Sequence, residues 1–161
     1  MIMRIILVTA AMLMPSILWA GSMQVEAGKM IFFHKENRVE FINNVQVERD
    51  NFIMNCDRLV VNYTEGENTE MEFADAFGHV IMTQGDKKGY ADTARLDQKN
   101  NILTLKGNAI MEQPGGRIEG ETITHNMASE KTEIQPVKGG RTHMTIETGD
   151  KGNSLLPGAG K

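Results

Sequence analysis

One pattern is written three times along this chain without a gap, and this repetition constrains the fold more than any other feature. The copies are FINNVQVERDNFIMNCDRLVVN from Phe41, AFGHVIMTQGDKKGYADTARLD from Ala76 and LKGNAIMEQPGGRIEGETITHN from Leu105. Each copy contains two runs of alternating apolar and polar residues joined by a polar turn, which is typical of a β-hairpin. Internal repeats of this length usually form stacked supersecondary units. The chain is therefore expected to stack antiparallel hairpins.

An acidic residue recurs at one place in the second run of every copy: Asp57, Asp92 and Glu121. Because the three positions are equivalent, they indicate a structural role at a strand end rather than a single active site. A half copy precedes the others. The segment VEAGKMIFF from Val25 matches MNCDRLVVN from Met54 in the same register.

Period-two alternation dominates from Gln24 to about Thr148, and no helical stripe exceeds one turn. These features predict an all-β architecture. Similar hairpins stacked at a constant step predict an open-ended roll of two facing sheets, whereas a closed barrel would pair its last strand with its first. The expected exposed edges lie near Val25 to Phe33 and near His143 to Glu147.

The two ends of the chain differ from the middle. Residues 1–20 combine Arg4, an apolar stretch and small residues near Ala20, which is the pattern of a secretory signal peptide. The apolar stretch is short for a membrane span, although a retained anchor is the alternative. Residues 21–148 are then expected to form one β domain, and the Gly-rich residues 149–161 a disordered tail.

Composition excludes several classes of function. Seventeen Lys+Arg against 21 Asp+Glu give a net charge of -4, and no basic stripe with interleaved aromatic residues occurs, so nucleic acid is not an expected partner. The single cysteine, Cys56, cannot form an intrachain disulfide and is predicted to be a small buried residue. An exported domain of this kind must be stabilised by its core.

No catalytic or metal-binding constellation is found. The histidines, His34, His79, His125 and His143, lack the spacing of metal ligands and are predicted to lie at the surface. Neither a nucleophile elbow nor a partner histidine for Cys56 occurs. The sequence therefore predicts a protein that is not an enzyme and has no cofactor.

Several short motifs, in their order and spacing, resemble those of the OstA-like family. These motifs are VEAGKMI, VEFINNVQV, AFGHVIMTQ and, most clearly, the copy that begins at Leu105. Asn43 and Asn44 depart from the usual Gly-Asn of the first copy, and the Gly-rich tail has no obvious counterpart. The resemblance implies a twisted, V-shaped β-jellyroll in the periplasm that carries lipopolysaccharide with its lipid A acyl chains in an apolar groove. It also implies head-to-tail self-association and pairing with inner-membrane LptC-like and outer-membrane LptD-like jellyroll domains.

A groove for acyl chains should be lined by the residues that alternation turns inward. The predicted lipid-binding set is Phe41, Val45, Val47, Leu59, Val61, Phe77, Val80, Met82, Leu96, Leu105, Met111, Ile118 and Ile123. Flexible methionines suit a surface that repacks around a sliding lipid, although any one of them could simply fill a core. Two rivals stay open: a polymerising structural β-solenoid of the envelope without cargo, and a jellyroll enzyme or sugar-binding domain, for which the chain has few aromatic residues.

Overall fold

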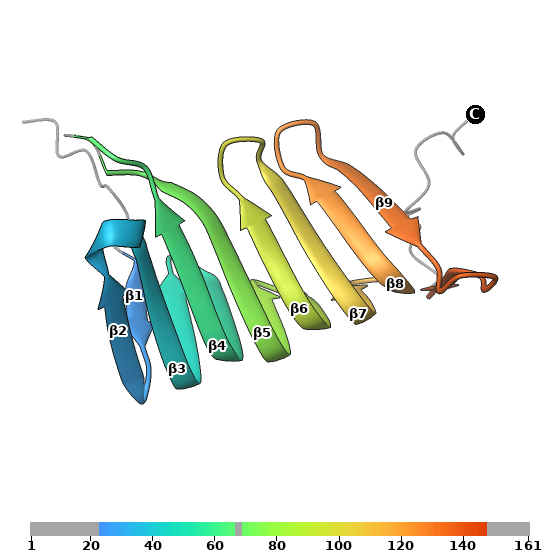
Figure 1. Ribbon diagram of the computed structural model, residues 1–161. Helices are drawn as coiled ribbons and strands as arrows, with labels where there is room; N and C mark the ends of the chain where they lie inside the picture. The colour runs from blue at the N-terminus through green and yellow to red at the C-terminus, as the bar shows by residue number, and fades with distance from the viewer. Residues whose placement is uncertain (1–22, 67–68, 148–161) are drawn as a thin grey trace, which may run out of the picture.

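The computed structural model describes residues 23–66 and 69–147, and Figure 1 shows that they form a bent, layered sheet. The predicted signal peptide and C-terminal tail lie outside the described residues. The elements are β1 (Gln24–Glu26), β2 (Lys29–Phe33), the 3-10 helix η1 (His34–Glu36), β3 (Arg38–Arg49), β4 (Phe52–Tyr63), β5 (Met71–Gln84), β6 (Lys87–Asp97), β7 (Ile102–Gln113), β8 (Gly116–Asn126), β9 (Lys131–Gln135) and β10 (His143–Ile146).

All strands in the part of the chain that the structure describes belong to one antiparallel sheet, which does not close there. The strand order is β1-β3-β4-β5-β6-β7-β8-β10, with β2 also paired to β3 and β9 also paired to β8. The predicted all-β, open-ended architecture is therefore confirmed. The N-terminal edge lies where the sequence placed it, whereas the C-terminal edge contains β9 as well as the expected β10. The half copy is confirmed too, because β1 and β2 pair with one side of β3 in the way that β4 pairs with the other.

Each long strand from β3 to β8 bends at its middle and so contributes to two facing arms. Arm A contains β2, β9 and the strand halves 38–42, 58–63, 71–77, 93–97, 102–106 and 122–126. Arm B contains β1, β10 and the halves 45–49, 52–56, 80–84, 87–91, 109–113 and 116–120. The arms meet along a line of register shifts, which we call the crease. This bend makes the predicted V-shaped roll.

The repeated acidic residues lie in the crease, so their predicted place at a strand end was wrong. Gly78 has a φ of +75°, and a Cβ built on it would lie 2.2 Å from Asp57 Oδ2. The same carboxylate oxygen lies 2.7 Å from His79 Nδ1, and this hydrogen bond raises the pKa of His79. Glycine is needed here because only a residue without a Cβ permits both the left-handed backbone and the close carboxylate.

The next repeat builds the same joint. Gly107 has a φ of +81°, and a Cβ there would lie 2.4 Å from Asp92 Oδ2. Asn108 Nδ2 donates a hydrogen bond to that oxygen at 3.1 Å. In both joints the glycine of one copy therefore lies against the aspartate of the copy before it.

The core lies between the arms. A Cβ on Gly89 of arm B would lie 3.5 Å from Leu105 Cδ1 of arm A, which shows that the arms face each other closely. The buried residues that form one core cluster are Val39, Phe41, Val45, Val47, Met54, Cys56, Leu59, Val61, Ala76, Val80, Met82, Ala91, Ala94, Leu105, Ala109 and Ile123. They stand on the inner rows of both arms.

A charged group is buried on the outer face of arm A. Glu40 accepts from Arg58 at 2.9 Å and is also paired with Arg38, and its side chain is only 9% exposed. Replacing it with the isosteric Gln removes both charge pairings and leaves two cations beside a neutral amide. Glu40→Gln is therefore expected to lower the free energy of unfolding by about 1–2 kcal/mol.

Urea unfolding of Glu40→Gln measures this contribution, and Glu133→Gln serves as the control. Glu133 pairs with Lys131 at 3.5 Å, but both side chains are more than half exposed. Its replacement should change stability by about 0.5 kcal/mol or less. Equal effects of the two variants would show that the outer network of Glu40 contributes no more than a solvated pair.

Candidate functional site

The interior between the arms is the candidate site, and the structure brings most of the predicted lining together. Nine members of the predicted set are buried in the core: Phe41, Val45, Val47, Leu59, Val61, Val80, Met82, Leu105 and Ile123. Met111 and Ile118 are partly buried and pack against that core. Leu96 is half-buried and pairs in register with Ala74 and Leu103, which pack on the core, so it shares their inner row.

Phe77 is the exception, and its predicted inward position was wrong. It follows the buried Ala76, so strand alternation turns it to the outer face, where it is 38% exposed. Its ring lies under the guanidinium of Arg58, with 5.5 Å from Cζ to the ring centroid. The residue is apolar because it packs beneath this cation, and not because it faces the core.

Several apolar side chains on the inner rows remain exposed at the edges. At the N-terminal edge Met30 and Phe32 pair with the buried Phe41 and Val39, yet they are 45% and 59% exposed. At the C-terminal edge Met144 pairs with Ile118, and Met144 and Ile146 are 46% and 41% exposed. We call these exposed ends the N mouth and the C mouth. The apolar interior thus continues to both open edges of the sheet.

Sequence reasoning placed none of these mouth residues in the lining set. The signal for Met30 and Phe32 was present, because the half copy aligns them with Leu59 and Val61. No repeat copy covers β10, so Met144 and Ile146 had no comparable signal.

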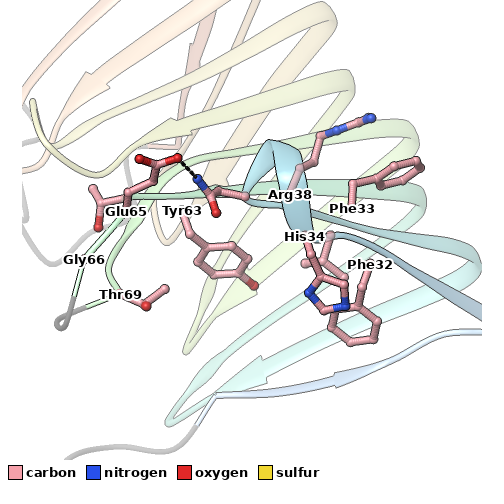
Figure 2. A pocket seen from close by; sticks show the side chains of 11 residues that line it. Phe32, Phe33, His34, Arg38, Tyr63, Glu65, Gly66 and Thr69 are labelled. Atoms are coloured by element: carbon pink, nitrogen blue, oxygen red, sulfur yellow. Dashed lines mark hydrogen bonds between the residues drawn. The ribbon is translucent and has the colours of Figure 1, made fainter.

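A cavity of about 420 Å³ opens beside the N mouth, and Figure 2 shows its lining from close by. Phe32, Val39 and Tyr63 supply apolar surface, and burial raises the pKa of Tyr63. Phe32 stacks on the ring of His34, with centroids 6.0 Å apart. A polar rim includes Asn37, whose Nδ2 donates to Glu65 Oε1 at 3.0 Å. The lining of this cavity is therefore mixed, with both polar and apolar surface.

Cys56 lies in the core, as predicted, and is not a reactive group. Burial and the neighbouring Asp57 raise its thiol pKa to about 11. The thiol is therefore protonated at every pH below that value at which the fold is stable, and the nucleophilic thiolate is scarce. Labelling with iodoacetamide near neutral pH should be at least about tenfold slower in the native protein than in urea. Equal rates would show that Cys56 is accessible.

The interior offers shape and apolarity rather than reactive groups. Among the described residues no three His, Cys, Asp or Glu side chains converge to hold a metal ion. His34, His79 and His143 are exposed and His125 is intermediate, and none lies with the others. No helix within 23–66 or 69–147 is long and apolar enough to cross a membrane.

Arg117, a basic residue at the rim of arm B, is held by carboxylates of its own chain. Its Nε donates to Glu119 Oε1 at 2.6 Å, and its Nη1 also donates to Glu112. These contacts raise the pKa of the guanidinium. Its charge is therefore already balanced within the chain.

Comparison with solved structures supports the fold. The crystal structure of LptH, the LptA-homologous periplasmic component of the lipopolysaccharide transport device of Pseudomonas aeruginosa, superposes with a TM-score of 0.69. The match covers 79% of this chain and 96% of LptH at 17% sequence identity. The two chains therefore share one architecture.

Curated relatives are similar over the strands. Lipopolysaccharide export system protein LptA of Escherichia coli K12 is 26% identical over 123 residues, which is 73% of this chain and 66% of the relative. LptA of Haemophilus influenzae is 25% identical over 113 residues, which is 66% of this chain and 64% of the relative. The chain thus spans about two thirds of the length of the curated relatives that it matches.

A family described as LptA/(LptD N-terminal domain) LPS transport protein matches residues 24–131, from β1 to the start of β9. This span includes all three sequence repeats, the crease and most of the apolar interior. The chain belongs to the LptA/LptD N-terminal domain family of lipopolysaccharide transport proteins.

Proposed function

We propose that this protein is a periplasmic lipopolysaccharide carrier that bridges the inner and outer membranes. Residues 1–20 direct export and are removed, and the acyl chains of lipid A travel between the arms. The protein is not an enzyme, and it moves its cargo passively along a path that other proteins supply with energy. The curated relatives are named lipopolysaccharide export system proteins, and this similarity supports lipopolysaccharide as the cargo.

The observation that carries the proposal is the apolar interior that runs without a break to both mouths. Each acyl methylene exposed to water costs about 0.8 kcal/mol, so one chain of about ten methylenes costs about 8 kcal/mol. A lipid with several chains therefore needs continuous apolar shelter. Met30 and Phe32 at one mouth and Met144 and Ile146 at the other extend such shelter beyond the buried core.

Cargo entry requires the arms to separate, because the interior side chains pack on one another. Leu105 of arm A reaches Gly89 of arm B, and an acyl chain must replace contacts of this kind. Met54 and Met82 are buried, and Met71 and Met111 are partly buried in the same interior. Unbranched thioether side chains change rotamer at low cost, which supports repacking around a moving lipid.

Strand direction supports bridging by head-to-tail pairing. From β3 to β8 the strands alternate in direction, and the broken strand β9–β10 runs from arm A to arm B while β1–β2 runs from arm B to arm A. The N mouth of a second copy can therefore pair with the C mouth of the first, and the strands stay antiparallel across the junction. The partners that we propose are further copies of this chain and the jellyroll domains of LptC-like and LptD-like proteins.

Binding of lipid can be tested with the purified protein and a fluorescent fatty-chain probe. The proposed function expects saturable binding that lipopolysaccharide displaces and that its deacylated polysaccharide does not. A probe that fails to bind, or that both competitors displace equally, would favour the rival scaffold without lipid cargo.

The free edge of β10 should be necessary for self-association. Glu147 N–H donates to Gly115 O at 3.0 Å, so antiparallel alternation points the N–H of Met144 away from β8 and toward the free edge. Met144→Pro removes that donor without removing a bond to β8. We expect self-association to weaken at least about tenfold in analytical ultracentrifugation.

Lys138→Pro is the matched control for this prediction. Gly140 N–H donates to Val137 O at 2.7 Å and Gly139 has a φ of +80°, which places Lys138 at the second position of a type II turn. Proline is favoured at that position. Its association should match the wild type, and equal weakening of both variants would contradict the role of the β10 edge.

A further inference from the structure

The direction of backbone groups at the two free edges is fixed by bonds inside the chain. At the C mouth, Glu147 bonds to Gly115, so Met144 presents its N–H and C=O to the free edge. At the other end, Gly85 N–H donates to Asn51 O at 3.4 Å, so Met54 forms no bonds to β5 and bonds instead to Val47 of β3. Val25, the partner of Val47, consequently presents its N–H and C=O to the free edge of β1.

The inner row of arm B runs in direct register from one edge to the other. Its members are Val25, Val47, Met54, Met82, Gly89, Met111, Ile118 and Met144. Bonded and non-bonded pairs alternate along this row, and the pair of Ile118 with Met144 is non-bonded. The next pair in this alternation, between Met144 and a residue of a second copy, must therefore be hydrogen-bonded. Val25 of the second copy has a free N–H and a free C=O that can form these bonds.

Arm A has the same arrangement. Its inner row contains Met30, Phe41, Leu59, Ala76, Ala94, Leu105, Ile123 and Ile134. Met127 N–H donates to Asn101 O at 2.8 Å, so Ile123 bonds to Leu105 and Ile134 presents its groups to the free edge. Tyr63 N–H donates to Asn37 O at 2.9 Å, so Phe41 bonds to Leu59 and not to Met30. The N–H and C=O of Met30 therefore point to the free edge of β2. The free backbone groups of both arms thus fit the same pairing with a second copy.

We propose, on the basis of the proposed self-association, that copies join in a single register, with Met144 opposite Val25 and Ile134 opposite Met30 of the next copy. A slip by one residue would turn the apolar rows of the second copy to the outer face. This register places a histidine between two carboxylates. On the outer row His143 pairs with Glu119 of β8, and Glu26 of the next copy continues that row.

The charges around His143 decide the effect of pH. The charged groups on its own loop, on the paired part of β8 and on the edge of the next copy are Lys138, Arg141, Arg117, Glu119, Glu26 and Glu48. Arg117 is already bonded to Glu119, whereas Glu26 adds a carboxylate only when copies join. An imidazolium gains a carboxylate neighbour only at the junction, so acid is expected to favour association.

A cysteine pair tests the register in the full protein. In the proposed register Thr145 lies opposite Gln24 of the next copy in a non-bonded pair, with Cα atoms about 4.5 Å apart, within disulfide range. Oxidation of Thr145→Cys/Gln24→Cys should give a ladder of covalent multimers. Thr145→Cys/Glu26→Cys is the off-register control and should give little. Equal ladders, or a stronger ladder from the control, would overturn the register, and Cys56 is buried in both.

Sedimentation at about pH 5.5 and pH 8 tests the junction of His143. The wild type is expected to associate about three- to fivefold more tightly in acid. His143→Gln and Glu26→Gln should lose this dependence, while the control His79→Gln, which lies in the crease away from both edges, should keep it. Dependence that persists in His143→Gln would overturn the assignment.

The two failures can be told apart. Wild type that stays monomeric at every pH contradicts the proposed self-association itself. Wild type that assembles and is weakened by Met144→Pro, but gives no in-register disulfide ladder, contradicts only the register.

Discussion

Gly78→Ala is expected to lower the free energy of unfolding by about 3 kcal/mol or more. The new Cβ would lie 2.2 Å from Asp57 Oδ2 and 2.9 Å from its Cγ, at a φ of +75° that L side chains rarely adopt. Either the carboxylate or the crease must then move, and the hydrogen bond of Asp57 with His79 is lost with it. Urea unfolding followed by circular dichroism measures the loss.

Gly139→Ala separates the two causes of this loss. Gly139 has a φ of +80°, almost that of Gly78, but nothing lies within 4 Å of a Cβ built there. The free energy of unfolding of Gly139→Ala should fall only by the cost of the left-handed backbone, about 1 kcal/mol. The double variant Gly78→Ala/Asp57→Ala should recover part of the loss. If Gly78→Ala and Gly139→Ala prove equally stable, the contact with Asp57 is not what requires glycine in the crease.

Ile123→Ala is the second large effect that we expect. Ile123 is 1% exposed and stands on the inner row of β8, so truncation removes buried apolar surface and leaves a cavity. The expected loss is about 2–5 kcal/mol. Thermal and urea unfolding both report it, and a fluorescent fatty-chain probe shows whether the new space is filled by lipid.

Ile81→Ala is the matched control, because it is the same substitution in the middle of a strand. Ile81 lies on the outer face and is 40% exposed, so its truncation should lose about 1 kcal/mol or less. A loss for Ile81 as large as that for Ile123 would mean that the outer face is packed, and would contradict the assignment of the interior.

The repeats made most of the fold predictable. Aligned copies locate equivalent positions, so Phe41, Ala76 and Leu105 had to share a face, and the structure buries all three. Phe77 is apolar like the lining residues, but the alignment matches it to Ile42 and Lys106, which lie on the outer face. The lesson is physical: an apolar residue can be stabilised beneath a neighbouring guanidinium as well as in a core.

The crease could not be predicted from the repeats. Gly78 and Asp57 come from different strands, and the need for glycine arises only when the carboxylate is brought against it. The exposure of the mouths also depends on which strand is last in the sheet, which sequence alternation does not encode. Met144 has the same inward phase as Ile118, but it is exposed because no further strand among residues 23–66 and 69–147 pairs with β10.

The most direct test of the account is photocrosslinking in living cells at two phenylalanines of one chain. A benzoyl-phenylalanine replaces Phe41, which faces the interior and is 7% exposed, or Phe77, which faces outward and is 38% exposed. The account predicts lipopolysaccharide adducts from position 41 and none above background from position 77. Adducts from position 77 alone, or from neither position in folded protein, would contradict the claim that the interior carries the lipid.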